Sequence, residues 1–371
     1  MHLYIRRAFV TDKVDDFFPP ALTFIKGVVD SDDLGLNISR ETLQNSSALR
    51  TIKAKTLSKV FEALKKSTSD SKKYKEIFDS YGDILKHMSL DQKHRSKIIP
   101  LLRFPTNKSE GELIGFQEYV DRMKPEQKQI YYLAGANTKE IEKSPYLEKL
   151  KAGDFEVFYM TGSIDEHVIT NLKDFDNHDF QNAASEKFKL PGESDDDIKK
   201  QEKEFKPLID IVQKTLDEDI EKVKLSTRLV DSPYVVVASQ HGWTGNMERV
   251  IMAQASAKDF PMMEFYAKQK KIFEINPNHA LIKSLLALAK KNPKSKNLRE
   301  RIRLLFDAGM IQAGYMLKDP NSFGSLVTKL ASNLSPETDS NISDVDEKKA
   351  SKTKKSDSKQ QDKFESDHDE L

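Results

Sequence analysis

The chain has 371 residues, more than one ordinary hydrophobic core accommodates, which predicts two or three domains. Lys and Arg number 60 against 59 Asp and Glu, so the formal net charge of +1 creates no global field that would attract nucleic acid or an anionic membrane. The absence of cysteine excludes disulfides and thiolate chemistry, the eight scattered His residues lack metal-ligand spacing, and no apolar run reaches the roughly 20 residues of a transmembrane helix.

The first hundred residues predict one strand followed by helices. Residues 3–10 are rich in β-branched and aromatic side chains, which is typical of a strand. Between residues 39 and 66, apolar residues recur at spacings of three and four and predict an amphipathic helix. A second helix is predicted over residues 74–85, and a third before Phe104.

The next part of the chain alternates between helix and strand patterns. A helix-like stretch at 117–123 precedes a strand-like one at 129–133, and a helix at 140–151 precedes a strand at 156–160. This alternation predicts a small α/β layer with parallel strands. Residues 191–197 combine turn formers with charges, which predicts a hinge.

The remaining sequence predicts a long helix, two strands, two closing helices and a polar tail. The expected ranges are 198–220, 224–229, 234–238, 298–315 and 322–334. Beyond Pro336 the chain consists mostly of Ser, Lys and Asp, a composition that cannot bury a core, so we expect disorder there.

The sharpest local signal is the segment 36–44, which reads Leu-Asn-Ile-Ser-Arg-Glu-Thr-Leu-Gln. Asn37 or Ser39 can cap a helix that starts here. Arg40 does not suit the positive end of a helix macrodipole unless an anion lies close. Two interpretations are open at this point. Arg40 forms a salt bridge to one of the aspartates at 30, 32 and 33, or it contacts a nucleotide phosphate with Gln44 one turn along the same face.

The only Trp of the chain lies in a glycine-flanked loop before a predicted helix. Trp243 is therefore either a hydrophobic anchor inside its own domain or an exposed contact residue. Methionines and aromatic residues concentrate nearby on a short amphipathic segment that contains Met262, Met263, Phe265 and Tyr266. Flexible thioethers suit the binding of varied apolar partners, although methionine stripes also fill cores.

Common catalytic and ligand-binding motifs are absent from the sequence. The pair Gly242 and Gly245 is not a phosphate loop, and no G-x-S-x-G, H-E-x-x-H or EF-hand pattern occurs. A small-molecule enzyme that used the 105–190 layer would need convergent titratable groups, and the sequence offers no such cluster.

The two ends of the chain give conflicting indications of the compartment in which the protein resides. The last four residues, His368, Asp369, Glu370 and Leu371, form the HDEL retention signal of the endoplasmic reticulum. Residues 1–7 lack the apolar region of a signal peptide. We therefore expect the chain to begin inside a longer precursor and to reside in the lumen. The alternative is a cytosolic protein with an accidental HDEL end.

Five segments together resemble the heat-shock protein 90 family. They are 3–7 (LYIRR), 24–32 (FIKGVVDSD), 36–44 (LNISRETLQ), 239–249 (SQHGWTGNMER) and 273–277 (FEINP). The segments occur in the family's order along the whole predicted folded part, and the HDEL end is similar to that of the lumenal member. Gly35 departs from the family, which usually has Pro there.

The resemblance implies an ATP-dependent chaperone. Arg40 matches the middle-domain arginine that reaches the ATP γ-phosphate, and Gln44 and Asn37 accompany it as catalytic residues. ATP and Mg²⁺ would be bound by an N-terminal domain that is absent here, so the chain alone should not turn over ATP. An ATP-independent dimeric scaffold or client-binding fragment is the alternative, if the chain is expressed from Met1.

The same resemblance implies a client-binding surface and a dimer interface. The expected client contacts are Trp243, Met247, Met262, Met263, Phe265 and Tyr266. The expected core of the dimer interface is Leu304, Leu305, Ile311, Phe323, Val327 and Leu330. The partners would therefore be unfolded client proteins, a second copy of the chain and the retention-signal receptor, with no nucleic acid, no membrane insertion and no metal.

The implied fold class is a multi-domain α+β and α/β chain. Middle-domain α/β subdomains with a helical coil would precede a mixed α+β dimerisation domain that ends in a helix pair. The expected boundaries are 1–66 for the rear of the large α/β subdomain, 67–103 for the helical coil, 104–190 for the small α/β subdomain, 191–336 for the dimerisation domain and 337–371 for the charged tail.

Overall fold

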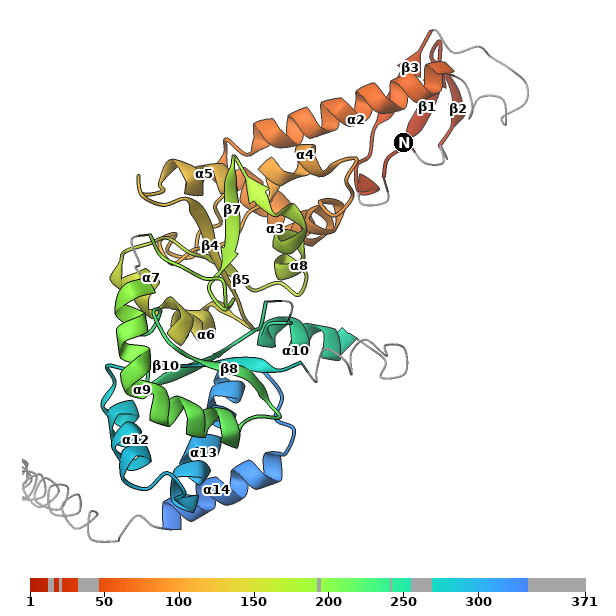
Figure 1. The fold of residues 1–371 in the computed structure, drawn as a ribbon. Coiled ribbons are helices and arrows are strands. Elements are labelled where there is room, and N and C mark those ends of the chain that lie inside the picture. Colours follow the sequence, from red (N-terminus) through yellow and green to blue (C-terminus); the bar gives the residue numbers. More distant parts are fainter. Residues whose placement is uncertain are drawn as a thin grey trace, which may run out of the picture. The chain divides into compact units, whose positions relative to one another are not determined.

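The computed structural model describes residues 1–12, 17–19, 22–32, 47–191, 195–240, 242–254 and 269–332 (Figure 1). The chain forms two units by its internal contacts, Met1–Leu317 and Lys318–Leu371. The described residues of the first unit form three separate sheets with helices beside them, so the mixed α and β fold class is confirmed. Among the described helices, none is long and apolar enough to cross a membrane.

The first sheet contains a hairpin where the sequence predicted a single strand. β1 (His2–Ile5) pairs antiparallel with β2 (Ala8–Thr11) and parallel with β3 (Val28–Ser31). Arg6 and Arg7 form the turn between β1 and β2 with positive φ angles of 48° and 66°. Such angles match the tight turns that join antiparallel strands. The predicted strand over 3–10 is wrong at its centre because these arginines take a conformation that Gly or Asn usually signals.

Two long helices follow the first sheet. α2 (Ser47–Ser67) confirms the end of the predicted helix over 39–66, whose start lies outside the described residues. α3 (Ser71–Met88) confirms the second prediction, and the Asp70 carboxylate caps it by accepting a hydrogen bond from the Lys73 amide at 3.1 Å. The third predicted helix is short, α4 (Arg95–Ile98) continued by the 3₁₀ turn η2 (Ile99–Leu101).

The second sheet is the predicted α/β layer. Its strand order is β5-β4-β7-β6, formed by Phe158–Met160, Gln129–Ala134, His178–Asn182 and Asp174–Phe175. β4 pairs parallel with both β5 and β7, which confirms the predicted parallel strands, and β6 adds an antiparallel edge. One hydrophobic cluster joins this layer to α2 and α3 through buried side chains that include Phe61, Phe78, Leu85, Phe104, Ile130 and Phe158.

The helices of this layer are shorter than the sequence predicted. α5 (Phe116–Asp121) and α8 (Asp165–Leu172) border the layer's strands. The single helix predicted over 140–151 is wrong. It is replaced by α6 (Thr138–Glu142), the 3₁₀ turn η3 (Pro145–Leu147) and α7 (Glu148–Ala152). Pro145 forces Ser144 into an extended conformation with ψ of 134°, which a continuous helix cannot contain.

The third sheet has the order β8-β10-β9, from Ile220–Leu225, Lys271–Ile275 and Tyr234–Val237. Its helices are α9 (Asp195–Thr215), α10 (Gly245–Gln254), α12 (Ala280–Lys291) and α13 (Lys296–Gln312). Buried side chains of α9, α12 and α13 form one core with β8 and β10 (Figure 1).

Three sequence predictions for this region need correction. Residues 195–197, predicted as part of a hinge, belong to α9, and residues 192–194 lie outside the described residues. The helix predicted to continue to 220 ends at Thr215, because Ile220 already opens β8. The strand predicted at 224–229 runs from 220 to 225 instead.

The second unit is described through α14 (Pro320–Ser332), which confirms the predicted final helix. The Asp319 carboxylate accepts a hydrogen bond from the Ser322 amide at 3.0 Å and so caps its first turn. None of the residues of α14 is buried. The predicted tail over 337–371 lies outside the described residues.

Candidate functional site

Most of the residues predicted from motifs lie outside the described residues. These are the expected catalytic residues Asn37, Arg40 and Gln44, the segment residues Met262, Met263, Phe265 and Tyr266, and the retention signal His368, Asp369, Glu370 and Leu371. Among the expected client contacts, Trp243 and Met247 are described. Trp243 lies just before α10, and Met247 lies in its first turn.

Met247 lines a pocket of about 440 Å³. α10 contributes Val250 and Ile251 to the same wall, one turn beyond Met247. Opposing walls come from His87 and Leu90 at the end of α3 and from Ile164 and His167 around the start of α8. These helices are separated by many residues in the sequence, so tertiary packing alone creates the pocket. Its walls combine apolar side chains from all three helix segments with polar ones such as His87 and Gln254, and its volume suits one or two apolar side chains.

A buried carboxylate borders this pocket. Glu166 on α8 accepts hydrogen bonds at Oε1 from Thr244 Oγ1 at 2.8 Å and from Asn182 Nδ2 at 2.9 Å. Its Oε2 accepts a hydrogen bond from Asn246 Nδ2 at 2.9 Å. Burial raises the pKa of the Glu166 carboxyl, although the three hydrogen bonds favour its charged form. The network holds the start of α10 against α8 and the end of β7.

The sequence analysis did not identify Glu166. A signal was present, because an acidic pair, Asp165 and Glu166, interrupts a stretch whose residues Val168, Ile169 and Leu172 are apolar at helical spacing. Asp165 is also buried, and its Oδ1 lies 2.8 Å from Lys86 Nζ on α3. Each of the two carboxylates thus connects α8 to a different helix.

The start of α10 also contacts the end of α13 without intervening side chains. A Cβ atom on Gly245 would lie 2.0 Å from the carbonyl oxygen of Ala313, so only glycine fits there. The Tyr315 hydroxyl donates a hydrogen bond to the backbone oxygen of Trp243 at 2.9 Å. The half-buried Trp243 is therefore tied to this junction through its backbone, and its role as a client contact stays a prediction.

A buried ion pair joins α10 to the third sheet. Lys271 Nζ on β10 lies 3.3 Å from Glu248 Oε2, and the exposed fractions of these side chains are 3% and 5%. The same ammonium lies 4.4 Å from the centroid of the Tyr315 ring, a cation–π distance. α10 is thus fixed at its first turn by Glu166, Gly245 and Glu248.

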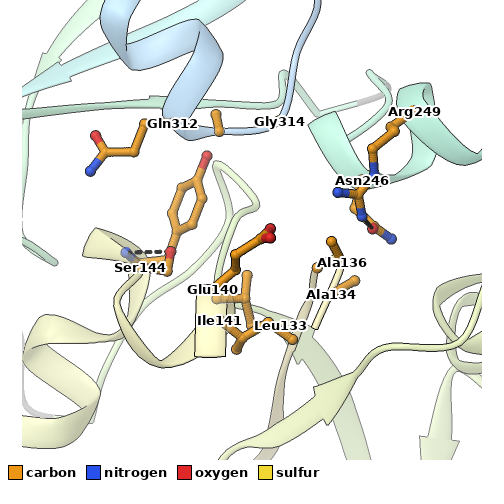
Figure 2. A pocket seen from close by; sticks show the side chains of 13 residues that line it. Leu133, Ala134, Ala136, Glu140, Ile141, Ser144, Asn246, Arg249, Gln312 and Gly314 are labelled. Atoms are coloured by element: carbon orange, nitrogen blue, oxygen red, sulfur yellow. Dashed lines mark hydrogen bonds between the residues drawn. The ribbon is translucent and has the colours of Figure 1, made fainter. Parts of the chain in front are cut away.

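A second, smaller pocket of about 70 Å³ lies on the other side of the α10 start (Figure 2). Asn246 and Arg249 line one side of it, and Glu140 and Ile141 on α6 line another. Arg249 Nη2 donates a hydrogen bond to Asn246 Oδ1 at 2.7 Å. Because Asn246 Nδ2 donates to Glu166, this one amide borders both pockets. The volume admits a few water molecules only.

Charged contacts also join the α/β layer to the third sheet. Arg228 forms a two-pronged pair with Glu274, with Nε–Oε2 and Nη2–Oε1 distances of 2.9 Å each. The remaining guanidinium donors reach the carbonyl oxygens of Ala183 and Ser185. Glu148 accepts hydrogen bonds from the Ser232 hydroxyl and from the amides of residues 230–232. Burial raises the pKa of the Glu148 carboxyl, but these hydrogen bonds outweigh burial and hold it below its usual value.

Comparison with known proteins decides the family. The model of the family described as "Hsp90 protein" matches residues 1–365. The chain belongs to the Hsp90 family. An endoplasmin homolog from Caenorhabditis elegans is 40% identical over 330 residues, and one from Hordeum vulgare is 37% identical over 350 residues. Each match covers 88% of this chain and 43% of the relative, so the chain spans less than half the length of these curated relatives.

In this Hsp90-family chain, the side chains expected at a dimer interface differ in burial. On α13, Leu305 packs against the core of the third sheet, whereas Ile311 is 50% exposed. On α14, Phe323, Val327 and Leu330 follow each other at spacings of four and three, so they share one helix face. Val327 is 42% exposed and Leu330 51%. This face is apolar and unburied within its own unit, and the dimer stays a prediction.

No group of three or more His, Asp and Glu side chains that could hold a metal ion occurs within the described ranges of this Hsp90-family chain. The nucleotide and Mg²⁺ that the resemblance implies would be reached by Arg40, which lies outside those ranges. In the described part of the chain, we take the pocket beside α10 as the candidate binding site.

Proposed function

We propose that this chain is the middle and C-terminal part of an ATP-dependent chaperone of the endoplasmic reticulum lumen. Membership of the Hsp90 family and identity of 37–40% to endoplasmin homologs support this proposal. The HDEL end supports retention in the lumen through the receptor that reads this signal. The domain boundaries stay as proposed above, with residues 104–190 as the small α/β subdomain and 191–336 as the dimerisation domain.

The observation that carries the client-binding part is the pocket beside α10. Its α10 wall contains Met247, whose flexible thioether adapts to side chains of different shape. Burying one aliphatic side chain contributes about 1.5–3 kcal/mol, less than the roughly 4 kcal/mol of a millimolar complex. One such pocket therefore holds a client weakly, and several contacts must act together. Weak, adaptable binding suits a chaperone that releases partly folded chains.

The nucleotide part of the proposal concerns residues outside the described ranges. We propose that Arg40 contacts the γ-phosphate of ATP and that Gln44 and Asn37 support it. ATP–Mg²⁺ would be held by a nucleotide-binding domain outside this sequence, and the bound metal would neutralise charge on the phosphates. The chain alone should then lack turnover. In the full-length protein, an unchanged rate for Arg40→Ala would contradict this assignment.

A substitution in the pocket tests client binding. Met247→Asp places a charge against Val250 and Ile251, so we expect the affinity for an unfolded client to fall about tenfold or more, because a buried unpaired charge is costly. The measurement is suppression of light scattering from a thermally denatured model enzyme as a function of chaperone concentration.

The matched control introduces the same charge at an apolar side chain far along the sequence. Phe9 on β2 is 57% exposed, and Phe9→Asp should leave suppression within about twofold of the parent chain. Equal losses for the two variants would show that general surface apolarity binds clients. Unchanged suppression by Met247→Asp would remove the pocket from the proposal.

A further inference from the structure

The loop between α12 and α13, with the exposed helix faces on either side of it, is strongly basic. Seven cationic side chains are exposed within residues 280–301, and the only carboxylate in that span is Glu300. The whole chain has a formal net charge of only +1, so positive charge is concentrated here. We call this surface the basic patch; its residues are Lys283, Lys290, Lys291, Lys294, Lys296, Arg299 and Arg301.

The packing of α12 places its lysines together. Ile282, Leu285, Leu286 and Ala289 of α12 are buried in the core of the third sheet. The opposite face of the helix therefore carries Lys283, Lys290 and Lys291, which share one side at spacings of seven and eight residues. The chain then turns directly into α13, so the cations of both helix ends lie close along the sequence.

Local helix electrostatics account for only part of this charge. Lysines in the last turn of α12 suit the negative end of its macrodipole. Lys296 and Arg299 lie in the first turn of α13, where the macrodipole is positive and cations are unfavourable. Their presence there strengthens the positive potential at the start of α13. An external anion would relieve this repulsion.

The surroundings of the cations distinguish between classes of partner. Helices that lie on membranes insert a broad apolar face, but Ile282, Leu285 and Leu286 of α12 are buried in the core. This leaves only the half-buried Leu281 and Leu288, which is 39% exposed, as large apolar residues outside it. Proteins that bind single-stranded nucleic acid stack bases on aromatic rings, and residues 280–301 contain no aromatic residue. Lysine ammonium groups on flexible stems suit carboxylates that come without fixed geometry.

We propose that the basic patch binds an acidic, extended segment of a partner protein. The contact would be electrostatic and would lie on helices other than those that line the pocket beside α10. It would be separate from the binding of apolar client side chains, and it does not depend on that pocket. The affinity should decrease steeply as salt increases, because exposed charges at these distances are screened.

The test uses the full 371-residue chain and two fluorescent peptides, one of alternating Glu and Ser and one with Gln in place of each Glu. Anisotropy at about 50 mM and about 300 mM salt spans the change in screening length from roughly 14 Å to 6 Å. We expect binding of the Glu peptide at low salt only, and no binding of the Gln peptide. Binding of both peptides alike would overturn the proposal.

Two variants with equal changes in charge locate the contact. The patch variant combines Lys290→Gln, Lys291→Gln, Lys294→Gln and Lys296→Gln. The control variant neutralises four exposed lysines of α2 and α3, namely Lys55, Lys65, Lys66 and Lys72, in the same way. We expect the patch variant to lose about tenfold or more in affinity for the Glu peptide and the control to lose about twofold at most.

Further measurements distinguish an acidic protein segment from other classes of partner. Equal losses in the two variants would show that only net charge matters and would overturn the patch. If the patch bound phosphatidylserine vesicles or a single-stranded RNA more tightly than the Glu peptide, the assignment of an acidic protein segment as the partner would be wrong. Melting temperatures of both variants check the fold. Client suppression by the patch variant, measured as for Met247→Asp, should be unchanged, which separates this proposal from the proposed function.

Discussion

Arg228 shows how a single residue holds two parts of the molecule together. Its side chain is 3% exposed, pairs with the side chain of Glu274, which is 6% exposed, and donates to two carbonyl groups of the α/β layer. Arg228→Met would leave Glu274 buried without its partner, and we expect a loss of about 3–5 kcal/mol in the free energy of unfolding. Urea denaturation followed by circular dichroism measures this loss.

Two control variants test whether the loss in Arg228→Met comes from the unpaired buried charge. The double variant Arg228→Met with Glu274→Leu removes both charges and should recover a large part of the loss. Lys59→Met breaks an ion pair with Glu62 whose side chains are 78% and 69% exposed, and it should cost less than about 1 kcal/mol. A single Arg228 variant as stable as the parent chain would show that the pair is not structurally important.

Glu166 makes stability depend on pH in a direction opposite to most carboxylates. Burial raises the pKa of its carboxyl above the ordinary value of 4.5, so between these two values the folded chain binds more protons than the unfolded chain. The stability contributed by this residue is therefore greatest below pH 4.5 and is lost as pH rises through the folded pKa.

Comparison with Glu166→Gln isolates this effect, because all other groups titrate alike in both proteins. We expect the melting temperature of the parent chain relative to the variant to be highest at and below about pH 4.5 and to fall as pH rises through the raised pKa of Glu166. Thermal melts across this range measure the difference. A difference that stays constant with pH would show that Glu166 keeps one protonation state throughout.

At the scale of the element, α10 depends on a glycine. In Gly245→Ala the new methyl group would meet the Ala313 carbonyl oxygen at 2.0 Å, so the helix must shift, and we expect a loss of about 1–3 kcal/mol. Differential scanning calorimetry measures the change, and client suppression should weaken with it because Met247 moves with the helix.

Gly324 on α14 provides the matched control for this substitution. A Cβ atom there would have no neighbour within 4 Å. Gly324→Ala in a helix interior should therefore leave stability unchanged or raise it by about 0.5–1 kcal/mol. If both glycine variants were equally destabilised, the close approach to Ala313 would not be the cause.

Elements with a regular apolar pattern were predictable from sequence, and those broken by local geometry were not. α3 and β4 have clear periodicity and lie where it predicts them. The helix expected over 140–151 is interrupted at Pro145. The proline is visible in the sequence, but the prediction gave more weight to the helical spacing of the residues around it. α12 was not predicted, although its apolar residues recur at helical spacing.

The candidate site was predictable only in part, for a physical reason. The role of Met247 was predicted from the resemblance to the family, because a local sequence motif identifies that position. The role of Glu166 could not be predicted in this way, because its hydrogen-bond partners Thr244 and Asn246 lie 78 and 80 residues away in the sequence. A sequence pattern reports neighbours along one helix or strand, and a buried carboxylate is recognised by donors that folding brings to it.

At the scale of the whole molecule, the apolar face of α14 predicts self-association. We expect the chain to have a light-scattering mass near twice its 42.4 kDa, and Val327→Asp to raise the dimer dissociation constant about a hundredfold or more, because two charges would be buried per dimer. Ser325→Asp on the opposite side of the helix should leave the mass unchanged. A parent chain that is monomeric at micromolar concentration would remove the dimer interface.

The glycine contact at the start of α10 has a consequence for the width of the pocket. Backbone atoms meet at Gly245 with no side chain between them, so the helix cannot slide there or be compressed. For a tilt of α10 about its first turn, the displacement of each residue grows with its distance from that turn. Ile251, further along the helix than Met247, therefore moves more for the same rotation. We therefore expect a larger side chain in this pocket to be accommodated by a tilt of α10, without repacking of the hydrophobic cores.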